Sequence, residues 1–196
     1  MVSVDDPDGA FIQRIWGGDQ SAFNQLVLKY RNRVMGVATR MLGNRVEAED
    51  LAQDVFVKVY HGLKEFKQES LFSTWLYRIT ANSCLNHQRR KRRERQANEA
   101  LDESELTLSD STSDPHIALE EKQLKLCLEK AIQALPREQK IVLILRDIEG
   151  LSYEAIADSL GVELGTVRSR LHRARLGVQG SVKKLFSLDE QRSEMQ

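Results

Sequence analysis

The sequence predicts an all-α protein: two small helical domains joined by a flexible acidic linker, the second containing a helix-turn-helix. Three observations lead to this fold class. Nearly every stretch outside one acidic segment repeats apolar residues at the helical period. No stretch alternates apolar and polar residues as a half-buried strand does. The segment 96–117 holds six carboxylates and no lysine or arginine, so it lacks the apolar area that would offset the entropy lost on ordering.

The first predicted domain spans residues 1–95 and contains four helices. Capping side chains mark their starts, because these side chains accept hydrogen bonds from the free backbone amides there. Glycines mark ends, because glycine commonly follows the last residue of a helix. The fourth helix continues into the run RRKRRER, in which six of seven residues are basic. The expected helices cover residues 9–16, 19 or 21 to 43, 44–63 and 70–95, with Asp19 or Ser21, Asn44 and Ser70 as caps.

The second predicted domain spans residues 118–186 and is followed by a tail over 187–196. Its first helix runs from Ala118 to Leu135. Pro136 suits the first position of the next helix, because the N–H that proline lacks has no helical partner there. The domain is small but large enough to fold around its own core.

Residues 151–175 predict a helix, a tight turn and a second helix rich in arginine. Ser152 can cap the first helix, and Gly161 has the backbone freedom to end it. The second helix begins between Glu163 and Thr166. This layout is typical of a helix-turn-helix whose second helix enters a DNA major groove, whereas a merely solvated basic helix needs neither the cap nor the turn. Its narrow apolar stripe consists of Val167, Leu171, Ala174 and Val178.

The composition implies neither a cofactor nor a metal. The net charge is zero, and the only two cysteines, Cys84 and Cys127, are interpreted as small core residues in a reducing compartment. No metal-ligand spacing is present. No apolar run is long enough to cross a bilayer and the N-terminus lacks a signal-peptide pattern, so we expect a soluble, cytoplasmic protein without direct membrane insertion.

The third predicted helix carries Asp50, Gln53 and Asp54 on one polar face, at positions i, i+3 and i+4. Solvation is the simplest explanation of such a face. Paired carboxylates also suit acid–base catalysis, but no histidine partner, apolar pocket or glycine-rich phosphate loop accompanies them, so no catalytic residue is assigned. Their one-sided placement favours the docking of a basic partner helix.

The fourth predicted helix and the loop before it interleave aromatic, amide and basic side chains. Such a set is typical of a single-strand binder, in which rings stack on unpaired bases, amides read base edges and arginines hold the backbone. Trp75 is more simply a core residue, because it neighbours Leu76. Tyr77, Arg78 and Asn82 cannot all face inward with Trp75, so the helix is a candidate site for flipped or unpaired bases.

Three strings follow one another in the chain: DLAQDVFVKVYHGL, FSTWLYRITANSCLNH and, after the acidic segment, LSYEAIADSLGVELGTVRSRLHRAR. Together they resemble bacterial sigma factors of the extracytoplasmic-function class, over about residues 21–178. No single string suffices, since helices similar to GTVRSRL occur in other regulators. The combination, in this order and spacing, is specific.

The resemblance implies two tasks for the first domain. It would dock on the clamp helices of the largest subunit of core RNA polymerase through Asp50, Gln53 and Asp54. It would also capture the melted −10 element of promoter DNA. The residues implied at the −10 element are Lys58, Phe66, Lys67, Tyr77, Arg78 and Asn82.

The resemblance assigns the −35 element to the second domain, whose surface would rest on the flap of the second-largest polymerase subunit. His172 departs from several members of the family, which carry phenylalanine there. Many relatives are held inactive by an anti-sigma factor, which is therefore an implied partner beside core polymerase and promoter DNA. The residues implied at the −35 element are Arg168, Ser169, His172 and Arg173 on bases, with Arg170 and Arg175 on phosphates.

The expected function is that of a promoter-specificity subunit, not an enzyme, which binds core polymerase and promotes DNA melting. The 22 residues of the linker, fully extended, span at most roughly 70–80 Å. Two elements about one and a half turns of duplex apart need on the order of 50–55 Å, so the linker can bridge them without the domains touching. Its carboxylates suggest that it threads a basic polymerase channel.

Two other classes of protein remain open from the residues alone. One is an operator-binding regulator that works through the helix-turn-helix, although such a protein needs a dimer to match two half-sites and no heptad pattern is present. The other is an RNA-binding or processing protein that uses the arginine-rich run. Only a promoter-specificity subunit would bind core polymerase and permit promoter-dependent transcription.

Overall fold

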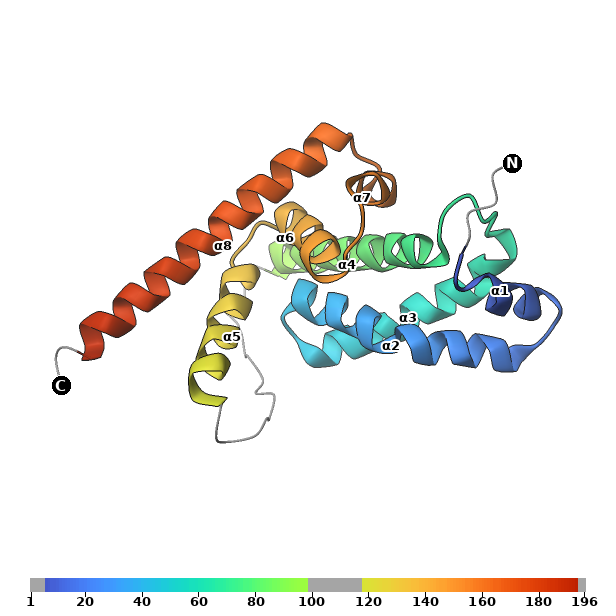
Figure 1. The fold of residues 1–196 in the computed structure, drawn as a ribbon, viewed down its shortest axis with the longest axis horizontal. Coiled ribbons are helices and arrows are strands. Elements are labelled where there is room, and N and C mark those ends of the chain that lie inside the picture. Colours follow the sequence, from blue (N-terminus) through green and yellow to red (C-terminus); the bar gives the residue numbers. More distant parts are fainter. Residues whose placement is uncertain (1–5, 99–117, 194–196) are drawn as a thin grey trace.

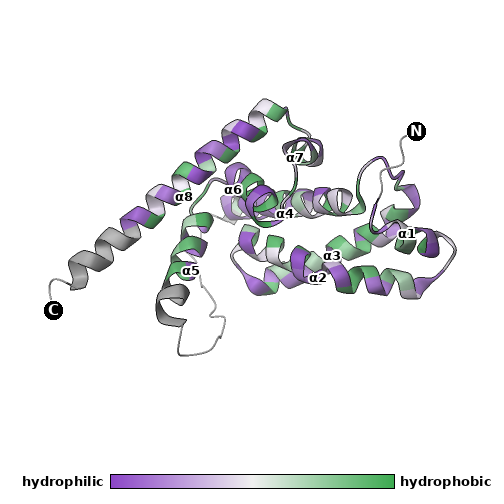
Figure 2. Cartoon of the chain, in the orientation of Figure 1, coloured by the Kyte–Doolittle hydropathy of each residue, from purple (hydrophilic) through white to green (hydrophobic). Residues whose placement is uncertain are grey.

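The computed structural model describes residues 6–98 and 118–193, and their side chains over 6–97 and 124–184. These ranges hold helices and short connections but no strand, which confirms the all-α fold class (Figure 1). Hydrophobic and hydrophilic residues alternate along the helices, as expected when each helix has one buried face (Figure 2). The helices are α1 (Gly9–Trp16), α2 (Gln20–Leu42), α3 (Arg45–Gly62), α4 (Phe72–Asn98), α5 (Ala118–Gln133), α6 (Arg137–Leu143), α7 (Tyr153–Leu160) and α8 (Leu164–Ser193).

Helices α1–α4 form the first helical unit, in which α2 and α3 are antiparallel neighbours and α4 packs against both (Figure 1). The predicted caps of α2 and α3 are confirmed. The Asp19 carboxylate accepts from the Ser21 and Ala22 amides, and the Asn44 side chain accepts from the amides that follow it. Gly43 ends α2 with a φ of 72°, a conformation that glycine adopts without steric cost.

The start of α4 differs from the prediction. Ser70 does not cap the helix: its hydroxyl donates to the Leu71 carbonyl, at 3.5 Å. The amide of Phe72, the first helical residue, instead donates to Asp6 Oδ2 at 2.6 Å. The Asp6 carboxylate of the N-terminal segment therefore caps the start of α4, where the local sequence predicted a serine.

Asp8 fastens the beginning of the chain to α2. Its side chain is fully buried and accepts from the Tyr30 hydroxyl and from the Lys29 ammonium. A buried carboxylate needs such partners, because an unpaired charge out of water is costly. Burial is also the main reason why the pKa of the Tyr30 hydroxyl is raised, and the hydrogen bond to Asp8 adds to it.

Helices α5–α8 form the second helical unit, which contains the predicted helix-turn-helix. The Ser152 hydroxyl accepts from the Ala155 amide at 3.0 Å, and Gly161 ends α7 with a φ of 63°, so both predicted boundaries are confirmed. The second helix of the motif, α8, begins at Leu164, within the predicted range. It continues to Ser193, well into the segment predicted as a tail.

The two helical units pack against each other. Helix α4 contacts α7, helix α2 contacts α5 and α6, and the buried residues of both units form one continuous core (Figure 1). The Tyr77 hydroxyl donates to the Glu149 carboxylate across this boundary, which we call the seam. The linker length permits the domains to lie apart, but in this arrangement they touch. Helix α4 also runs three residues into the predicted linker, to Asn98, and residues 99–117 lie outside the described ranges.

The two cysteines differ in burial. Cys84 is fully buried in the core, as predicted, and burial raises the pKa of its thiol to about 12. Cys127 on α5 is only partly buried, so its interpretation as a core residue is wrong. Three leucines of the same helix, Leu124, Leu126 and Leu128, are between 42% and 48% exposed, because α5 covers α2 and α8 along only part of its surface.

Candidate nucleic-acid and polymerase interfaces

Helix α8 presents a basic face away from the core. Val167, Leu171 and Ala174 are buried, as the predicted apolar stripe requires. At the helical period the opposite face then carries Arg168, His172 and Arg173, and all three are exposed. The exposed half of α8 can therefore meet a partner without any change in its packing.

The remaining residues predicted at the −35 element lie on the flanks of this face. Ser169 is half-buried, and its hydroxyl donates to the Thr166 carbonyl at 3.0 Å. Arg170 is half-buried close to Glu138, whose pKa is lowered by its hydrogen bond to Arg137 against the opposing effect of burial. Neither side chain is as free as the three on the exposed face.

Arg175 is engaged within the second helical unit. Its guanidinium donates twice to the Asp147 carboxylate, at 3.0 and 2.6 Å. Both side chains are partly exposed, so this ion pair contributes little to stability and can exchange for another anion. The Nη1 donors of Arg175 are not used by Asp147.

Asp50, Gln53 and Asp54 lie together on α3 and are all exposed, as their spacing predicts. Gln53 also borders a groove of about 870 Å³ between α2 and α3. Apolar and aromatic side chains such as Phe23, Phe56 and Tyr60 line part of the groove, and polar or charged side chains line the rest. Sequence reasoning missed it, although the exposed Val57 and Tyr60 follow Gln53 at i+4 and i+7 and so share its face of the helix.

Four of the residues predicted at the −10 element are exposed around α4. Arg78 and Asn82 lie on α4 one turn apart, and Lys67 lies in the loop before it. The Lys58 ammonium of α3 donates to the Ser83 hydroxyl of α4 at 2.9 Å, which places it beside Asn82. A basic and amide-bearing surface therefore exists, built from two helices and a loop.

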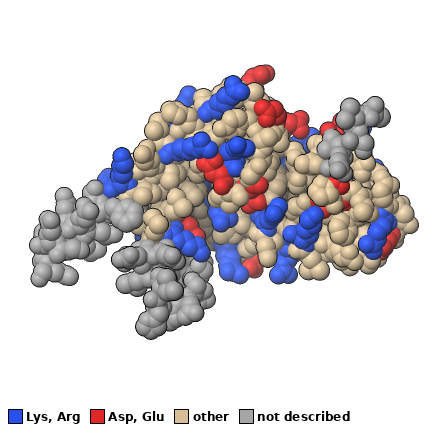
Figure 3. Space-filling view, in the orientation of Figure 1, with Lys and Arg blue, Asp and Glu red and all other residues tan. Residues whose placement is uncertain are grey.

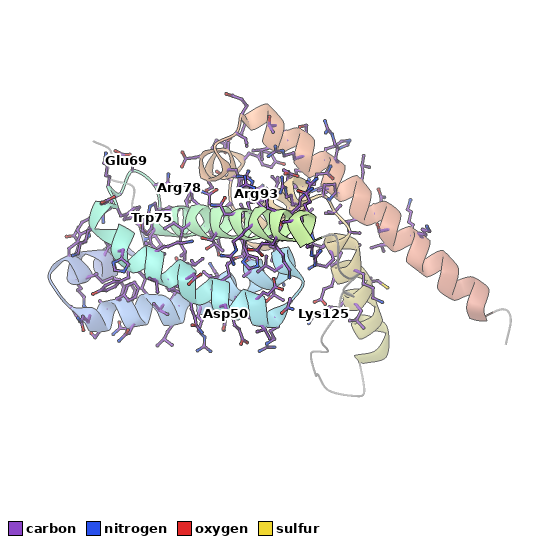
Figure 4. The ribbon with its side chains drawn as sticks, turned by 180° about the vertical axis from the view of Figure 1, so that it is seen from behind. Asp50, Glu69, Trp75, Arg78, Arg93 and Lys125 are labelled. Atoms are coloured by element: carbon purple, nitrogen blue, oxygen red, sulfur yellow. The ribbon has the colours of Figure 1, made fainter. Side chains whose placement is uncertain are left out.

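The two aromatic residues predicted at this site do not belong to its surface. Phe66 is 5% exposed and packs on the Trp75 ring, with centroids 5.0 Å apart, and on Phe72. Tyr77 is 1% exposed, and its hydroxyl is bound to Glu149 in the seam. Base stacking by Phe66 and Tyr77 is thus a wrong expectation for this arrangement, because both rings fill the core. Trp75 is confirmed as a core residue, whereas Arg78, which follows one turn later on α4, is exposed (Figure 4).

The C-terminal half of α4 forms a second basic surface. The Glu47 carboxylate accepts from Lys91 and His87, and the bond to Lys91 is the chief cause of its lowered pKa. Lysine and arginine side chains also spread over α8 and the face below it, with a few acidic side chains between them (Figure 3). Most of the arginine-rich run is exposed, namely Arg89, Arg90, Arg92, Arg93 and Arg95.

The described residues bear on two further expectations. None of the helices in the described ranges is both long and apolar enough to span a bilayer. Among the same residues, histidine, cysteine, aspartate and glutamate side chains do not gather in a group able to hold a metal ion.

Comparison with known families accounts for both helical units. Residues 26–94 match the model of sigma-70 region 2, and residues 125–176 match that of sigma-70 region 4. The first match covers α2 from Leu26, α3, and α4 through most of the arginine-rich run, and the second covers the later part of α5 through the exposed basic face of α8. The two matches therefore divide the chain where the acidic segment does.

Similar proteins extend over nearly the whole chain. The RNA polymerase sigma-H factor of Pseudomonas aeruginosa is 36% identical over 186 residues, which are 92% of this chain and 96% of the relative. The ECF RNA polymerase sigma-E factor of Escherichia coli is 34% identical and covers 91% and 96% of the two chains. The sigma factor RpoE of Bartonella quintana, solved with the anti-sigma factor NepR, is 26% identical, has a TM-score of 0.68 and covers 82% of this chain and 96% of its own. The chain thus belongs to the extracytoplasmic-function sigma factors, the alternative sigma subunits of bacterial RNA polymerase.

Proposed function

We propose that this sigma factor directs core RNA polymerase to promoters by gripping duplex DNA with α8 and unpaired DNA with the surface around α4. The observation that carries the proposal is the exposed basic face of α8, presented by a capped helix-turn-helix. It is supported by a second, separate basic surface on the unit that matches region 2. The protein acts as a binding subunit in the cytoplasm, beside the polymerase, and the chemistry of RNA synthesis belongs to the core enzyme.

At the −35 element, α8 enters the major groove with Arg168, His172 and Arg173 toward base edges. Ser169 lies at the border of this face, and Arg170 and Arg175 hold phosphates on either side. Arginine suits guanine because its fork matches two acceptors of that base, and contacts to phosphate position the helix without reading sequence. The ion pair between Arg175 and Asp147 is weak enough for a phosphate to replace the Asp147 carboxylate.

At the −10 element, Asn82 reads an unpaired base, while Lys58, Lys67 and Arg78 hold the strand backbone. The exposure of these four side chains supports the assignment. Phe66 and Tyr77 are left out of it, since their rings support the surface from within. Capture of unpaired bases stabilises the opened duplex, because each base so held no longer returns to its partner strand.

The polymerase contacts lie on other faces. Asp50, Gln53 and Asp54 dock on the clamp helices of the largest subunit, and the second helical unit rests on the flap of the second-largest subunit. Exposure of the three α3 residues beside a partly apolar groove supports the first contact. An anti-sigma factor is a further proposed partner, because a solved relative is held in complex with one.

The proposal is tested by reconstitution with core polymerase. The full chain is expected to co-elute with core enzyme and to permit run-off transcription from its own promoter, identified by sequencing the transcripts that it directs. The triple variant D50A/Q53A/D54A is expected to lose co-elution while keeping its helical content. Failure of the wild-type chain to bind core enzyme would overturn the proposal, whatever its affinity for free DNA.

A further inference from the structure

A hollow of about 430 Å³ lies on the seam, where the C-terminal half of α4 meets the connection between α5 and α6. Views from opposite sides place the end of α4, where Arg93 is labelled, close to this connection (Figures 1 and 4). The volume is within the range of small-ligand sites. The hollow is lined by Gln88, Arg92, Leu135, Arg137, Glu138 and Lys140, and we call it the seam hollow.

The ammonium of Lys140 is buried in this hollow without a carboxylate. The residue is 6% exposed, and its Nζ donates to the backbone and side-chain oxygens of Gln133, both at 2.9 Å. No acidic side chain pairs with Lys140 within the described residues. A desolvated cation with only amide oxygens around it is an unfavourable group, and an anion in the hollow would neutralise it.

The Gln88 amide, whose residue also lines the hollow, has an unused acceptor. Its Nε2 donates to the Met41 carbonyl at 2.6 Å, at the end of α2, which fixes the orientation of the amide. Its Oε1 is buried and accepts no hydrogen bond from any described residue. Buried amide oxygens are normally satisfied, so this one points to a donor that the protein itself does not supply.

The charges around the hollow sum to an excess of two positive charges. Arg92, Arg137 and Lys140 contribute three, and Glu138 offsets one through its pair with Arg137, at 2.6 Å. Arginine guanidinium groups match the oxygens of a phosphate in a fork geometry. A group with two negative charges and a neighbouring hydroxyl therefore complements the hollow in both charge and hydrogen bonding.

We propose that the seam hollow binds the phosphate monoester of a small phosphorylated ligand, such as a nucleoside monophosphate or a sugar phosphate. The phosphate meets Arg92, Arg137 and Lys140. A hydroxyl of the ligand donates to Gln88 Oε1, which requires a small movement of the side chains that cover this oxygen. A duplex backbone fits less well, because its phosphodiesters carry one charge each and no hydroxyl. The proposal does not depend on the function proposed above.

Binding in the seam hollow joins the two helical units. Gln88 and Arg92 belong to α4 of the first unit, whereas Arg137 and Lys140 belong to α6 of the second. A ligand that contacts both favours the closed arrangement by its difference in affinity between the closed and separated forms. If the units must separate to reach two promoter elements, a consequence that does rest on the proposed function, the ligand opposes initiation.

Calorimetric titration of the full chain at pH 7 tests the binding itself. The probes are inorganic phosphate, adenosine 5′-monophosphate, sulfate and a short duplex without promoter sequence. The first two are expected to bind, and sulfate, which has no hydroxyl to donate, is expected to bind more weakly. Arg92→Gln is expected to weaken both phosphate probes about tenfold, the effect of losing one charge-assisted hydrogen bond.

Arg93→Gln is the matched control, because it removes the same charge from the next residue of α4 outside the hollow. It is expected to leave phosphate binding unchanged. Equal losses in the two variants, or no loss in Arg92→Gln, would overturn the proposed site. Equal affinity for sulfate would overturn the role of Gln88. A duplex that binds through Arg92 while neither phosphate probe binds would make the hollow a DNA-backbone contact and the proposal wrong.

Discussion

At the scale of single residues, the buried polar side chains carry the most specific interactions of this fold. Asp8 is fully buried with the Tyr30 hydroxyl and the Lys29 ammonium as donors, and Tyr77 is buried with Glu149 as its acceptor. Lys140 differs, because its partners are neutral oxygens. Such groups add less net stability than apolar ones, but each is costly to leave unpaired, so they restrict how the helices can be arranged.

Removing one of these donors gives a direct test. Tyr30→Phe keeps the ring but takes away the hydroxyl that donates to Asp8, so a buried carboxylate loses one partner. We expect the free energy of unfolding to fall by about 1.5–3 kcal/mol, as for hydrogen bonds to charged groups. Urea denaturation measures it. Tyr60→Phe, at a tyrosine that is 44% exposed, serves as the control and should change stability by less than about 0.5 kcal/mol.

The lysine in the seam predicts a dependence of stability on pH. Burial lowers the pKa of Lys140 from 10.5 to about 8, while the unfolded chain keeps the ordinary value. Between these two pH values the unfolded chain binds more protons, so the contribution of Lys140 to the free energy of unfolding rises with pH. Urea denaturation of the wild type and Lys140→Met at pH 7, 8, 9 and 10 should show that the free energy of unfolding of the wild type rises relative to that of the variant as the pH increases. If the free energies of unfolding of the two proteins change with pH in parallel, the result would contradict the buried position of the ammonium.

The exposed face of α8 is tested at Arg173. If its guanidinium forms two bonds to a guanine, Arg173→Ala should cost about 1–3 kcal/mol in promoter binding and relax the preference at that base pair. Holoenzyme binding to the native promoter is compared with binding to promoters substituted at single −35 positions. An equal loss on every promoter would show that Arg173 contacts a phosphate instead.

At the scale of elements, α4 combines three faces on one helix. Trp75 and Leu76 enter the core, Tyr77 enters the seam, and Arg78 and Asn82 remain exposed. The helix is long enough that its C-terminal half carries a further, arginine-rich surface. A helix can serve several partners in this way because its side chains leave the axis in all directions at steps of about 100°.

The exposed face of α4 gives a prediction for strand opening. Asn82→Ala removes an exposed amide without touching the core, so the fold and the duplex contacts of α8 should persist. Open-complex formation should be impaired, because one contact to the unpaired strand is lost. Permanganate reactivity of the −10 region measures the opening, and holoenzyme binding to the −35 element measures the control. Normal reactivity at −10 would refute the role of Asn82 in strand capture.

At the scale of the whole molecule, the seam holds the two helical units in a closed arrangement. On the function proposed above, two promoter elements on the order of 50–55 Å apart require these units to separate, which exposes apolar area of α4 and α7 to water or to a new partner. The contact is therefore in competition with the polymerase-bound form. Its strength sets how readily the free sigma factor opens.

A single substitution in the seam tests this competition. Glu149→Ala leaves the buried Tyr77 hydroxyl without an acceptor and should loosen the contact of α4 with α7. The expected result is faster hydrogen exchange in α7 and on the facing side of α4, with the core of the first unit unchanged. Glu129→Ala, on the exposed surface of α5, is the control. Unchanged exchange in α7 would mean that the Tyr77–Glu149 bond does not support the closed arrangement.

Local features of the sequence predicted most of the elements. The helical period identified the all-α class, and Asp19, Asn44, Ser152 and Gly161 marked helix ends because their effects operate within a few residues of chain. The exposed sets on α3 and α8 followed from spacing alone. The prediction of Ser70 as the cap of α4 was wrong, because Asp6, distant in the chain, accepts from the free amide of Phe72. The groove between α2 and α3 was missed, since two helices must be placed before it exists.

By itself, the sequence determined the helices, their polar faces and membership of the sigma family, all of which depend on residue order and short-range physics. Only the tertiary structure decided which aromatic rings are free. In the sequence, Phe66 and Tyr77 are typical of base-stacking residues. Their large apolar surfaces are buried in the core and the seam, so their rings are not accessible to a nucleic acid in this arrangement. It also decided that the units meet and that the seam hollow forms on the surface between them. Contacts between residues far apart in the chain depend on packing as a whole, and no local pattern records them.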